Sequence, residues 1–424
     1  GGAIVDMLYP AGAPSRIPTI AVTGTNGKTT TVRLTAHLLA EGGCRVGVST
    51  TDGVYVAGRL IYSADATGPA SAQMILGDPT VDVAVLETAR GGLLRRGLGY
   101  DWSDVGIITN IDAEHLGQDG LETVDDLMDV KSVVAEHVRD GGTLILNADD
   151  MNVRSLVDMK FVRAEHKNVV WFSVDSDNPV VNAHVRSGER AYVLEDGWLV
   201  EYTGTERTAL SRAGELPGAF GGVSAHAIAN ALAALAASRA VGIAAEVADQ
   251  RLRAFDPWID NPGRGMLWQH GDVYMLIDYA HNAHGIAAMA QTVSAVWGRD
   301  RGIALVNLPG DRRDDLLEAS ARAVADGFDR ILVYDGDDLR GRKRDEIPGI
   351  VCEAIADYRP EVSCSAVPDM AAAITEGLRQ ANPGDVMLVM YEKIDPVLDY
   401  LTELGATPVS PDGETASQMA GQMR

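Results

Sequence analysis

The sequence has few cysteines, few aromatic residues and no long apolar run. Its three cysteines, Cys44, Cys352 and Cys364, are an odd number without CxxC spacing, so we expect neither a disulfide framework nor a cysteine-built zinc site. No apolar run reaches the roughly 18 residues of a membrane span, and no signal peptide is visible. Aromatic residues make up 5% of the chain, so small aliphatic side chains must fill the cores. These absences predict a soluble protein of a reducing, cytoplasmic compartment.

Positive charge is also scarce. The 424 residues include 36 Lys and Arg against 60 Asp and Glu, which gives a net charge of -24. Nucleic acids and anionic membranes both require a basic surface, so we expect neither as a main partner. The length suggests about two to three domains. The chain begins with Gly1 rather than Met, which is typical of a fragment or a processed form.

Short β-branched segments alternate with helical patterns in the first part of the chain. The expected strands are 19–23, 46–49, 81–87, 105–109 and 143–146, and the expected helices between them include 29–41 and 124–138. Strands that alternate with helices predict a mainly parallel α/β sheet. Residues 168–215 instead suggest short strands separated by turns, an antiparallel excursion, before a helix at 224–240.

A stretch rich in turn-forming residues, 256–265, divides the chain and is expected to act as a hinge. Beyond it, a second α/β pattern has expected strands at 273–278, 303–308, 330–334 and 386–390. We therefore predict three regions: a linker from an upstream domain at 1–18, a first α/β domain at 19–260 with the β-rich excursion, and a second, Rossmann-like α/β domain at 261–424.

The strongest local signal is the motif TGTNGKTT at residues 23–30, between an expected strand and an expected helix. Backbone N–H groups at such a helix start bind phosphate oxygens. Lys28 is expected to neutralise the β- and γ-phosphates, and the Thr29 hydroxyl to ligate Mg²⁺. The strict pattern GxxxxGK[ST] is not met, because Val22 stands where its first glycine belongs. The predicted phosphate-binding residues are Gly24, Thr25, Asn26, Gly27, Lys28, Thr29 and Thr30; the alternative is an incidental strand–turn–helix.

Three further candidates follow later strands. Glu87 ends an expected strand and precedes two glycines, at the crevice where α/β sheets bind ligands, and it could bridge Mg²⁺ ions. His115 follows the strand at 105–109, and Lys131 lies on an expected helix. Taken alone, Glu87 and Lys131 fit solvated side chains, and His115 fits a capping or packing histidine equally well.

Together these features resemble the Mur ligases, ATP-dependent enzymes that form amide bonds. Three further motifs, in the order expected for the family, extend the resemblance toward the end of the chain. Residues 226–230 (HAIAN) resemble the family's adenine-side helix, residues 261–264 (NPGR) its phosphate-contacting arginine, and residues 278–282 (DYAHN) its C-terminal nucleotide motif. The resemblance implies that Asn230, Arg264 and Asp278 bind the nucleotide and that His281 is catalytic.

Other stretches are similar to the Mur-ligase-like part of cyanophycin synthetases. These stretches are residues 5–18, 67–72, 87–98 and 308–315. Those enzymes carry an ATP-grasp domain ahead of this region, so an upstream ATP-grasp domain is a candidate partner. The sequence departs from the family at Glu114, where an aspartate usually precedes the histidine; the charge is the same and the side chain is longer.

The resemblance implies a two-step reaction that uses ATP and Mg²⁺. A substrate carboxylate attacks the γ-phosphate, and an amine then displaces phosphate from the acyl phosphate. The implied metal ligands are Thr29, Glu87, His115 and a carbamylated Lys131, and the implied catalytic residues are Lys28, Glu87, His115, Lys131 and His281. The expected substrates are a free amino acid, arginine, and an aspartate side-chain carboxylate of a peptide or polymer acceptor, joined by an isopeptide bond. A homo-oligomer is compatible with this function.

Two other functions fit the same motifs. One is a stand-alone ligase that joins a different amino acid to a peptide or small-molecule carboxylate. The other is a non-catalytic module that binds ATP, although Lys28, Glu87 and His115 are all intact. A non-ligase P-loop protein would lack the ordered motifs at 230, 264 and 278–282.

Overall fold

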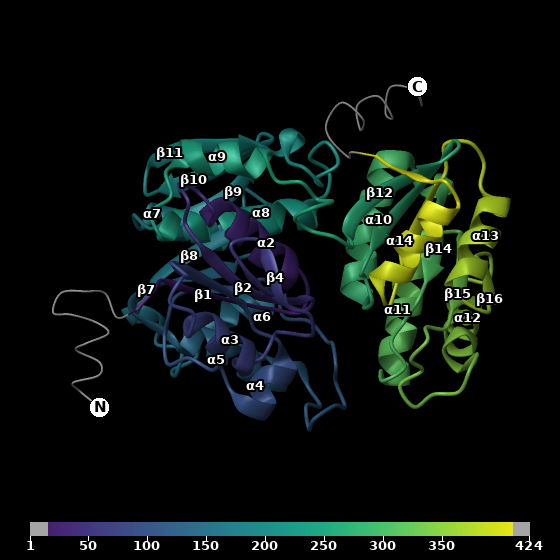
Figure 1. The fold of residues 1–424 in the computed structure, drawn as a ribbon, viewed down its shortest axis with the longest axis horizontal. Coiled ribbons are helices and arrows are strands. Elements are labelled where there is room, and N and C mark those ends of the chain that lie inside the picture. Colours follow the sequence, from purple (N-terminus) through teal and green to yellow (C-terminus); the bar gives the residue numbers. More distant parts are fainter. Residues whose placement is uncertain (1–15, 410–424) are drawn as a thin grey trace.

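The computed structural model describes residues 16–409, which form two α/β domains (Figure 1). The first contains a sheet of eleven strands in the order β11-β10-β9-β8-β7-β6-β1-β5-β2-β3-β4, and the second a sheet of seven in the order β16-β15-β14-β17-β13-β12-β18. Most of the predicted linker, residues 1–15, lies outside the described residues. Within residues 16–409, no helix is long and apolar enough to cross a membrane.

The first sheet is parallel at its centre and antiparallel at both edges. Its central strands are rich in valine and isoleucine and are buried, as expected for a sheet covered by helices on both faces. The strands are β1 (Thr19–Thr23), β2 (Val46–Thr50), β3 (Gly53–Val56), β4 (Arg59–Tyr62), β5 (Val83–Glu87), β6 (Ser103–Ile108), β7 (Val138–Asn147), β8 (Asn168–Ser173), β9 (Arg190–Glu195), β10 (Trp198–Thr203) and β11 (Glu206–Arg212).

The β-rich segment at 168–215 continues this sheet, which corrects the predicted antiparallel excursion. β8 pairs parallel with β7 and with β9. Within this segment, the antiparallel pairs are therefore β9 with β10 and β10 with β11. The helix α7 (Pro179–Arg186) makes the parallel crossover possible. Its start is encoded locally, because the Asn178 side chain accepts hydrogen bonds from two backbone N–H groups and Pro179 occupies the first turn.

Helices cover both faces of the first sheet. α2 and α8 pack together on one face in a core that includes Leu34, Leu38 and Leu235, and α5 covers the other face. The remaining helices are shorter. The helices of this domain are α2 (Lys28–Leu39), α3 (Pro69–Leu76), α4 (Arg90–Arg96), α5 (Val124–Glu136), α6 (Met151–Ser155), α7, α8 (Ala225–Ala240) and α9 (Ala245–Arg253).

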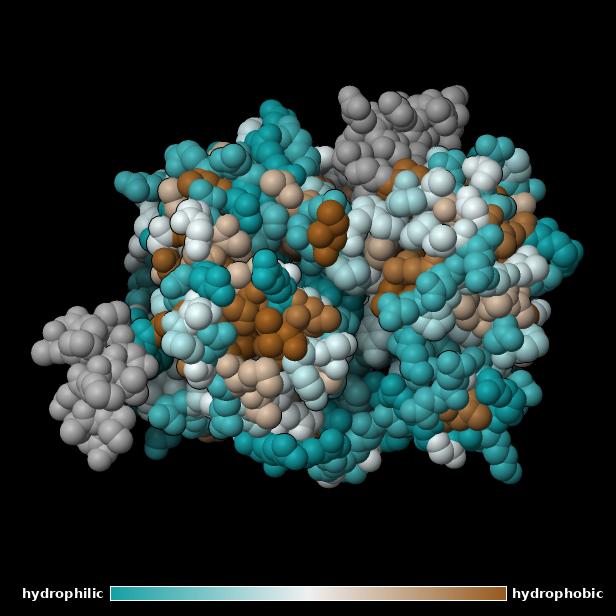
Figure 2. Space-filling model, in the orientation of Figure 1, coloured by the Kyte–Doolittle hydropathy of each residue, from teal (hydrophilic) through white to brown (hydrophobic). Residues whose placement is uncertain are grey.

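The outer edge of the first sheet is apolar. Among residues 16–409, no strand pairs with the outer side of β4, and Leu60, Ile61 and Tyr62 are each at least half exposed, at 52%, 59% and 50%. Figure 2 shows a hydrophobic patch over this region, surrounded by mostly hydrophilic surface.

The second sheet is parallel except for two strands at one edge, β12 and β18. Its first strand begins at Arg264, at the end of the turn-rich stretch 256–265. Its strands are β12 (Arg264–His270), β13 (Val273–Asp278), β14 (Gly302–Val306), β15 (Arg330–Tyr334), β16 (Ser363–Val367), β17 (Val386–Met390) and β18 (Thr407–Pro408). Its helices are α10 (Ala283–Trp297), α11 (Asp314–Gly327), α12 (Glu346–Tyr358), α13 (Met370–Gln380) and α14 (Ile394–Glu403).

Two of the three cysteines form a disulfide, which corrects the expectation that none would. Cys352 on α12 is joined to Cys364 on β16, with the Cα atoms 5.6 Å apart. The pairing arises because α12 packs against β16, and sequence spacing does not reveal that contact. Cys44 is free.

Candidate active site

The P-loop lies between β1 and α2, and two glycines fix its path. Gly24 and Gly27 have φ values of 153° and 82°, which non-glycine residues rarely adopt. A Cβ atom on Gly24 would lie 1.9 Å from the Thr109 Oγ1, and one on Gly27 would lie 2.3 Å from the Asn230 Oδ1. Only glycine fits at either position, and the backbone N–H groups at the start of α2 remain accessible to phosphate.

The loop after β6 holds the P-loop in place. The Thr109 Oγ1 donates to the Asn26 carbonyl oxygen at 2.6 Å, and the Asn110 side chain accepts from the Asn26 N–H at 2.7 Å. The Asn26 side chain faces the second domain, where it exchanges two hydrogen bonds, of 3.1 and 3.0 Å, with the side chain of Asn282. Asn26 therefore links the P-loop to the other domain.

A charged crevice of about 630 Å³ lies between the two domains beside the P-loop. All five predicted catalytic residues line it, together with Thr29 and Arg264. Basic residues from both domains predominate around it. The ionisable lining residues are Lys28, Asp65, Glu87, Arg90, Arg95, Arg96, Glu114, His115, Lys131, Arg264, His281, Asp311, Arg312 and Arg340.

Lys131 is buried on α5, so the interpretation of a solvated helix face is wrong. The side chain is 4% exposed, and its Nζ donates to the Gly24 carbonyl oxygen at 2.7 Å. Burial and, to a smaller extent, the charge of Lys28 together lower the pKa of Lys131 to about 7. A large fraction of the side chain is therefore neutral at pH 7, the form of an amine that reacts with CO₂.

Glu87 and His115 face the same crevice. Glu87, at the end of β5, is 3% exposed and accepts from the Thr51 hydroxyl at 3.0 Å, so it is not a solvated loop residue. The His115 Nδ1 lies 3.0 Å from the Gln118 Oε1. Burial is the main reason that the pKa of His115 falls to about 4, so its ring is neutral at pH 7, the form that ligates metals.

The side chains of Thr29, Glu87, His115 and Lys131 can hold a divalent cation on one condition, the modification of Lys131. Within residues 16–409, no group of three or more His, Cys, Asp or Glu side chains is placed to hold a metal. The predicted ligand set instead combines one carboxylate, one neutral imidazole and the hydroxyl of Thr29 with Lys131. A lysine amine is a poor Mg²⁺ ligand, whereas its carbamate supplies the oxygen atoms that Mg²⁺ prefers. The metal site therefore stays a prediction that requires the modification of Lys131.

The second domain contributes four basic side chains to the crevice, Arg264, His281, Arg312 and Arg340. The Arg264 guanidinium lies 4.5 Å from the centre of the Tyr279 ring, and Asp278 accepts from the Gly265 N–H at 2.9 Å. The His281 Nε2 lies 2.7 Å from the Glu114 Oε1, and a guanidinium nitrogen of Arg312 lies 3.7 Å from the same oxygen.

Glu114 and Arg312 are site residues that the sequence analysis did not assign. Burial alone would raise the pKa of Glu114, but the hydrogen bond from His281 and the nearby charges hold it well below its ordinary value. Arg312 lies in the segment 308–315, whose resemblance to cyanophycin synthetases was the available signal.

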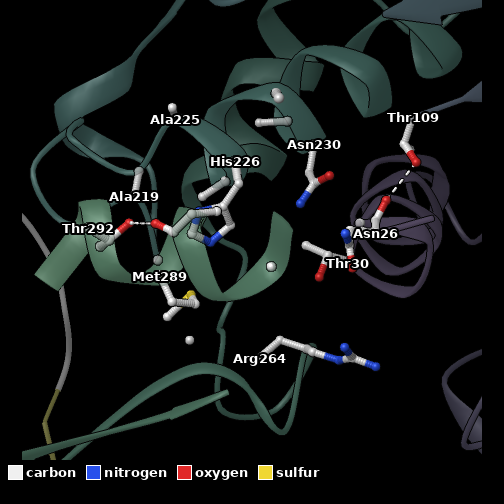
Figure 3. A pocket seen from close by; sticks show the side chains of 18 of the residues that line it. Asn26, Thr30, Thr109, Ala219, Ala225, His226, Asn230, Arg264, Met289 and Thr292 are labelled. Carbon is white, nitrogen blue, oxygen red and sulfur yellow. Dashed lines mark hydrogen bonds between the residues drawn. The ribbon is translucent and has the colours of Figure 1, made fainter. Parts of the chain in front are cut away.

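A second cavity, of about 370 Å³, lies on the other side of the P-loop. His226 and Asn230 of α8 face it, and Arg264 lies across from them (Figure 3). Burial lowers the pKa of His226 to about 4, so the ring is neutral. Both cavities are lined by Asn26, Gly27, Thr30, Arg264 and Tyr279.

Comparisons with known families agree with this fold. Residues 22–238 match the Mur ligase middle domain, and residues 263–390 match the domain described as Mur ligase, glutamate ligase domain. The chain therefore belongs to the Mur ligase family of ATP-dependent acid–amino-acid ligases. The family resemblance and the α/β fold class predicted from the sequence are confirmed.

Among individual proteins, the chain is similar to cyanophycin synthetases. It is 41% identical over 392 residues to the cyanophycin synthetase of Crocosphaera subtropica, covering 92% of this chain and 44% of that one. It is 40% identical over 399 residues to that of Synechocystis sp., covering 94% and 45%. The chain thus spans about half the length of the curated relatives it matches.

Solved structures share the fold across both domains. The bifunctional folylpolyglutamate synthase/dihydrofolate synthase of Yersinia pestis, complexed with AMPPNP and a Mn ion, has a TM-score of 0.66 and 20% identity, covering 95% of this chain and 92% of that one. The roles of individual site residues in this chain remain predictions.

Proposed function

We propose that this chain is an ATP- and Mg²⁺-dependent amide ligase that adds arginine to an aspartate side-chain carboxylate of cyanophycin or a similar polymer. The main support is the charged crevice, which joins a nucleoside-sized cavity at the P-loop and carries basic groups from both domains. The similarity of about 40% identity to cyanophycin synthetases supports the choice of substrates.

In the first step, the acceptor carboxylate attacks the γ-phosphorus of ATP, and the bond from that phosphorus to the bridging oxygen breaks to release ADP. Both reactants are anionic, so the step requires positive charge. Lys28 from the P-loop and Arg264 from the second domain supply it, and His281 lines the same crevice. Mg²⁺ held by Thr29, Glu87, His115 and carbamylated Lys131 would neutralise further phosphate charge.

In the second step, the amine of the incoming amino acid attacks the acyl carbon. The C–N bond forms, inorganic phosphate leaves, and the nitrogen loses a proton. The acyl phosphate must be protected from water between the steps. A crevice enclosed by two domains does so once the domains have closed over the nucleotide.

A small hollow of about 20 Å³ beside the crevice has side chains suited to the polar ends of the incoming arginine. It is lined by His281 and Asn307 and by the charged side chains of Asp338, Arg340 and Glu392. The two carboxylates can bind a guanidinium group, and Arg340, which also lines the crevice, can bind the α-carboxylate. Bound in this way, the α-amine of arginine would point toward the acyl phosphate.

The opposite side of the crevice suits an anionic acceptor. α4 contributes Arg90, Arg95 and Arg96 to its lining. The Arg95 side chain is 70% exposed, so it can contact carboxylates of a polymer that extends out of the crevice. The acidic surface elsewhere on the protein makes this basic edge the natural place for such an acceptor.

Phosphate release measured with each amino acid in turn tests this function. The purified chain, MgATP and an Asp-terminated cyanophycin primer should release phosphate with arginine and form an isopeptide. Release with another amino acid would favour the stand-alone ligase. ATP binding without release under any condition would favour the non-catalytic module.

A paired variant tests the arginine hollow. Asp338→Asn should raise the KM for arginine by about tenfold, because it removes one charge-assisted hydrogen bond of about 1.5 kcal/mol. Asp337→Asn is the matched control, since Asp337 lines a different hollow. Equal effects of the two substitutions would contradict this placement of arginine.

A further inference from the structure

We propose that Glu114 is a positioning residue that holds His281 and Arg312 of the second domain in the crevice, so that both side chains face the phosphoryl group being transferred. The proposal rests on the proposed ligase function but not on which amino acid is added.

Glu114 lies in the loop after β6 and is 6% exposed. Its Oε1 lies 2.7 Å from the His281 Nε2 and 3.7 Å from the Arg312 guanidinium. The same oxygen lies 3.4 Å from the Nε2 of the adjacent His115. One carboxylate of the first domain therefore meets two basic groups of the second.

Both partners are fixed by further contacts. The His281 Nδ1 lies 2.8 Å from the Tyr279 carbonyl oxygen, so both ring nitrogens have a partner. The Arg312 side chain is 5% exposed and pairs with Asp311 at 2.8 Å. Its buried Nε has no hydrogen-bond partner among residues 16–409.

Charge balance makes these contacts depend on domain closure. A buried carboxylate without a partner is costly, and His281 and Arg312 reach Glu114 only when the domains meet. Lys28 of the P-loop also acts on Glu114 electrostatically. Glu114 therefore favours the closed arrangement and offsets the repulsion between Arg312 and Lys28.

The length of the Glu114 side chain is as important as its charge. An aspartate would withdraw the carboxylate by about 1.5 Å, the length of one C–C bond. From 2.7 Å, that shift takes it beyond the usual hydrogen-bond limit of about 3.2 Å to His281. The glutamate, a departure from the family's usual aspartate, thus suits this contact.

Kinetics of the full chain test the proposal. Glu114→Gln and Glu114→Asp should each lower kcat by about 10- to 100-fold and change the KM for ATP by less than about threefold, since neither variant alters the nucleoside cavity. Glu122→Gln is the matched control: its carboxylate also faces the second domain, 3.5 Å from Arg313, but is 66% exposed. It should keep the wild-type kcat. Wild-type kcat in Glu114→Gln would overturn the proposal.

A double-mutant cycle separates coupling from general damage. If Glu114 acts through His281, Glu114→Gln combined with His281→Gln should lose little more activity than the worse single variant. If the activity losses of the two single variants instead multiply in the double variant, Glu114 does not act through His281.

Spin-label distances between the domains, measured with MgAMPPNP, give a readout that does not need ligation. Glu114→Gln should show fewer closed molecules than the wild type, and an unchanged distribution would overturn the proposal. Failure of the wild type to form any amide would instead count against the proposed function.

Discussion

The two cavities beside the P-loop differ in what lines them. The cavity next to α8 has apolar walls that include Phe172, Ala219 and Met289, whereas charged side chains surround the crevice. Both share Arg264 and part of the P-loop. On the proposed function, we infer a division between the cavities: apolar contacts would hold the nucleoside, and charges would act on the phosphates. Substitutions in the first cavity should raise the KM for ATP, and substitutions in the crevice should lower kcat.

Lys28→Ala should have the largest effect. Its ammonium is predicted to contact the β- and γ-phosphates, and loss of one such donor costs about 10²- to 10³-fold in kcat. Circular dichroism should show an unchanged fold, and exposed Lys160 provides the control, Lys160→Ala. Wild-type phosphate release by a folded Lys28→Ala protein would show that the crevice does not take part in phosphoryl transfer.

Lys131 tests whether the crevice needs an anion at this position. Lys131→Ala should lower kcat by about 100-fold, the upper range for lost metal-site groups, and acetate should restore part of the activity. Lys131→Arg should stay inactive, because arginine keeps a positive charge and forms no such carbamate. Full activity of Lys131→Arg would rule out the carbamate.

Domain closure tests whether the two cavities work as one site. The connector is anchored on the second domain, where the Tyr391 hydroxyl donates to the Gly263 carbonyl oxygen at 2.7 Å. Small-angle scattering should show a smaller radius of gyration with MgAMPPNP than without it. Identical profiles would contradict the hinge predicted at 256–265.

His226→Ala tests the nucleoside cavity. We expect the KM for ATP to rise about three- to tenfold, the effect of losing one hydrogen bond, with kcat within about twofold of the wild type. His166→Ala, a substitution of a half-exposed histidine, is the control. A fall in kcat equal to that of Lys28→Ala would contradict the division between the cavities.

Cys352→Ser should have the smallest effect on activity. Neither cavity is lined by Cys352 or Cys364, so kcat and the KM values should stay at wild-type levels. The free energy of unfolding, measured in urea without reductant, should fall by about 2–3 kcal/mol. Reductant should abolish that difference. A change in kcat would mean that the far end of the second domain affects the crevice.

Local patterns were sufficient to predict the strand–turn–helix at 23–30 and most of the parallel strands of both sheets, because strands and helices alternate along the chain. They did not predict the strands β3, β4, β12 and β16. The same reasoning missed the helix α7, although Asn178 and Pro179 mark its start.

Contacts between distant segments could not be predicted from spacing. His281 and Glu114 are separated by 167 residues, and Arg312 and His115 by 197, so their meeting depends on how the domains pack. The burial of Lys131 had a local signal, because it lies on the same helix face as Leu127 and Val134, which are both buried.

The reciprocal amide pair between Asn26 and Asn282 has a kinetic consequence. Asn26 lines both cavities, so a nucleotide that spans them lies beside a bridge between the domains. On the proposed function, we expect ADP to leave after that bridge parts and the next ATP to enter before it re-forms. The opening rate would then set a ceiling on the turnover number, and accumulated ADP should slow the enzyme as a product inhibitor that holds the bridge shut.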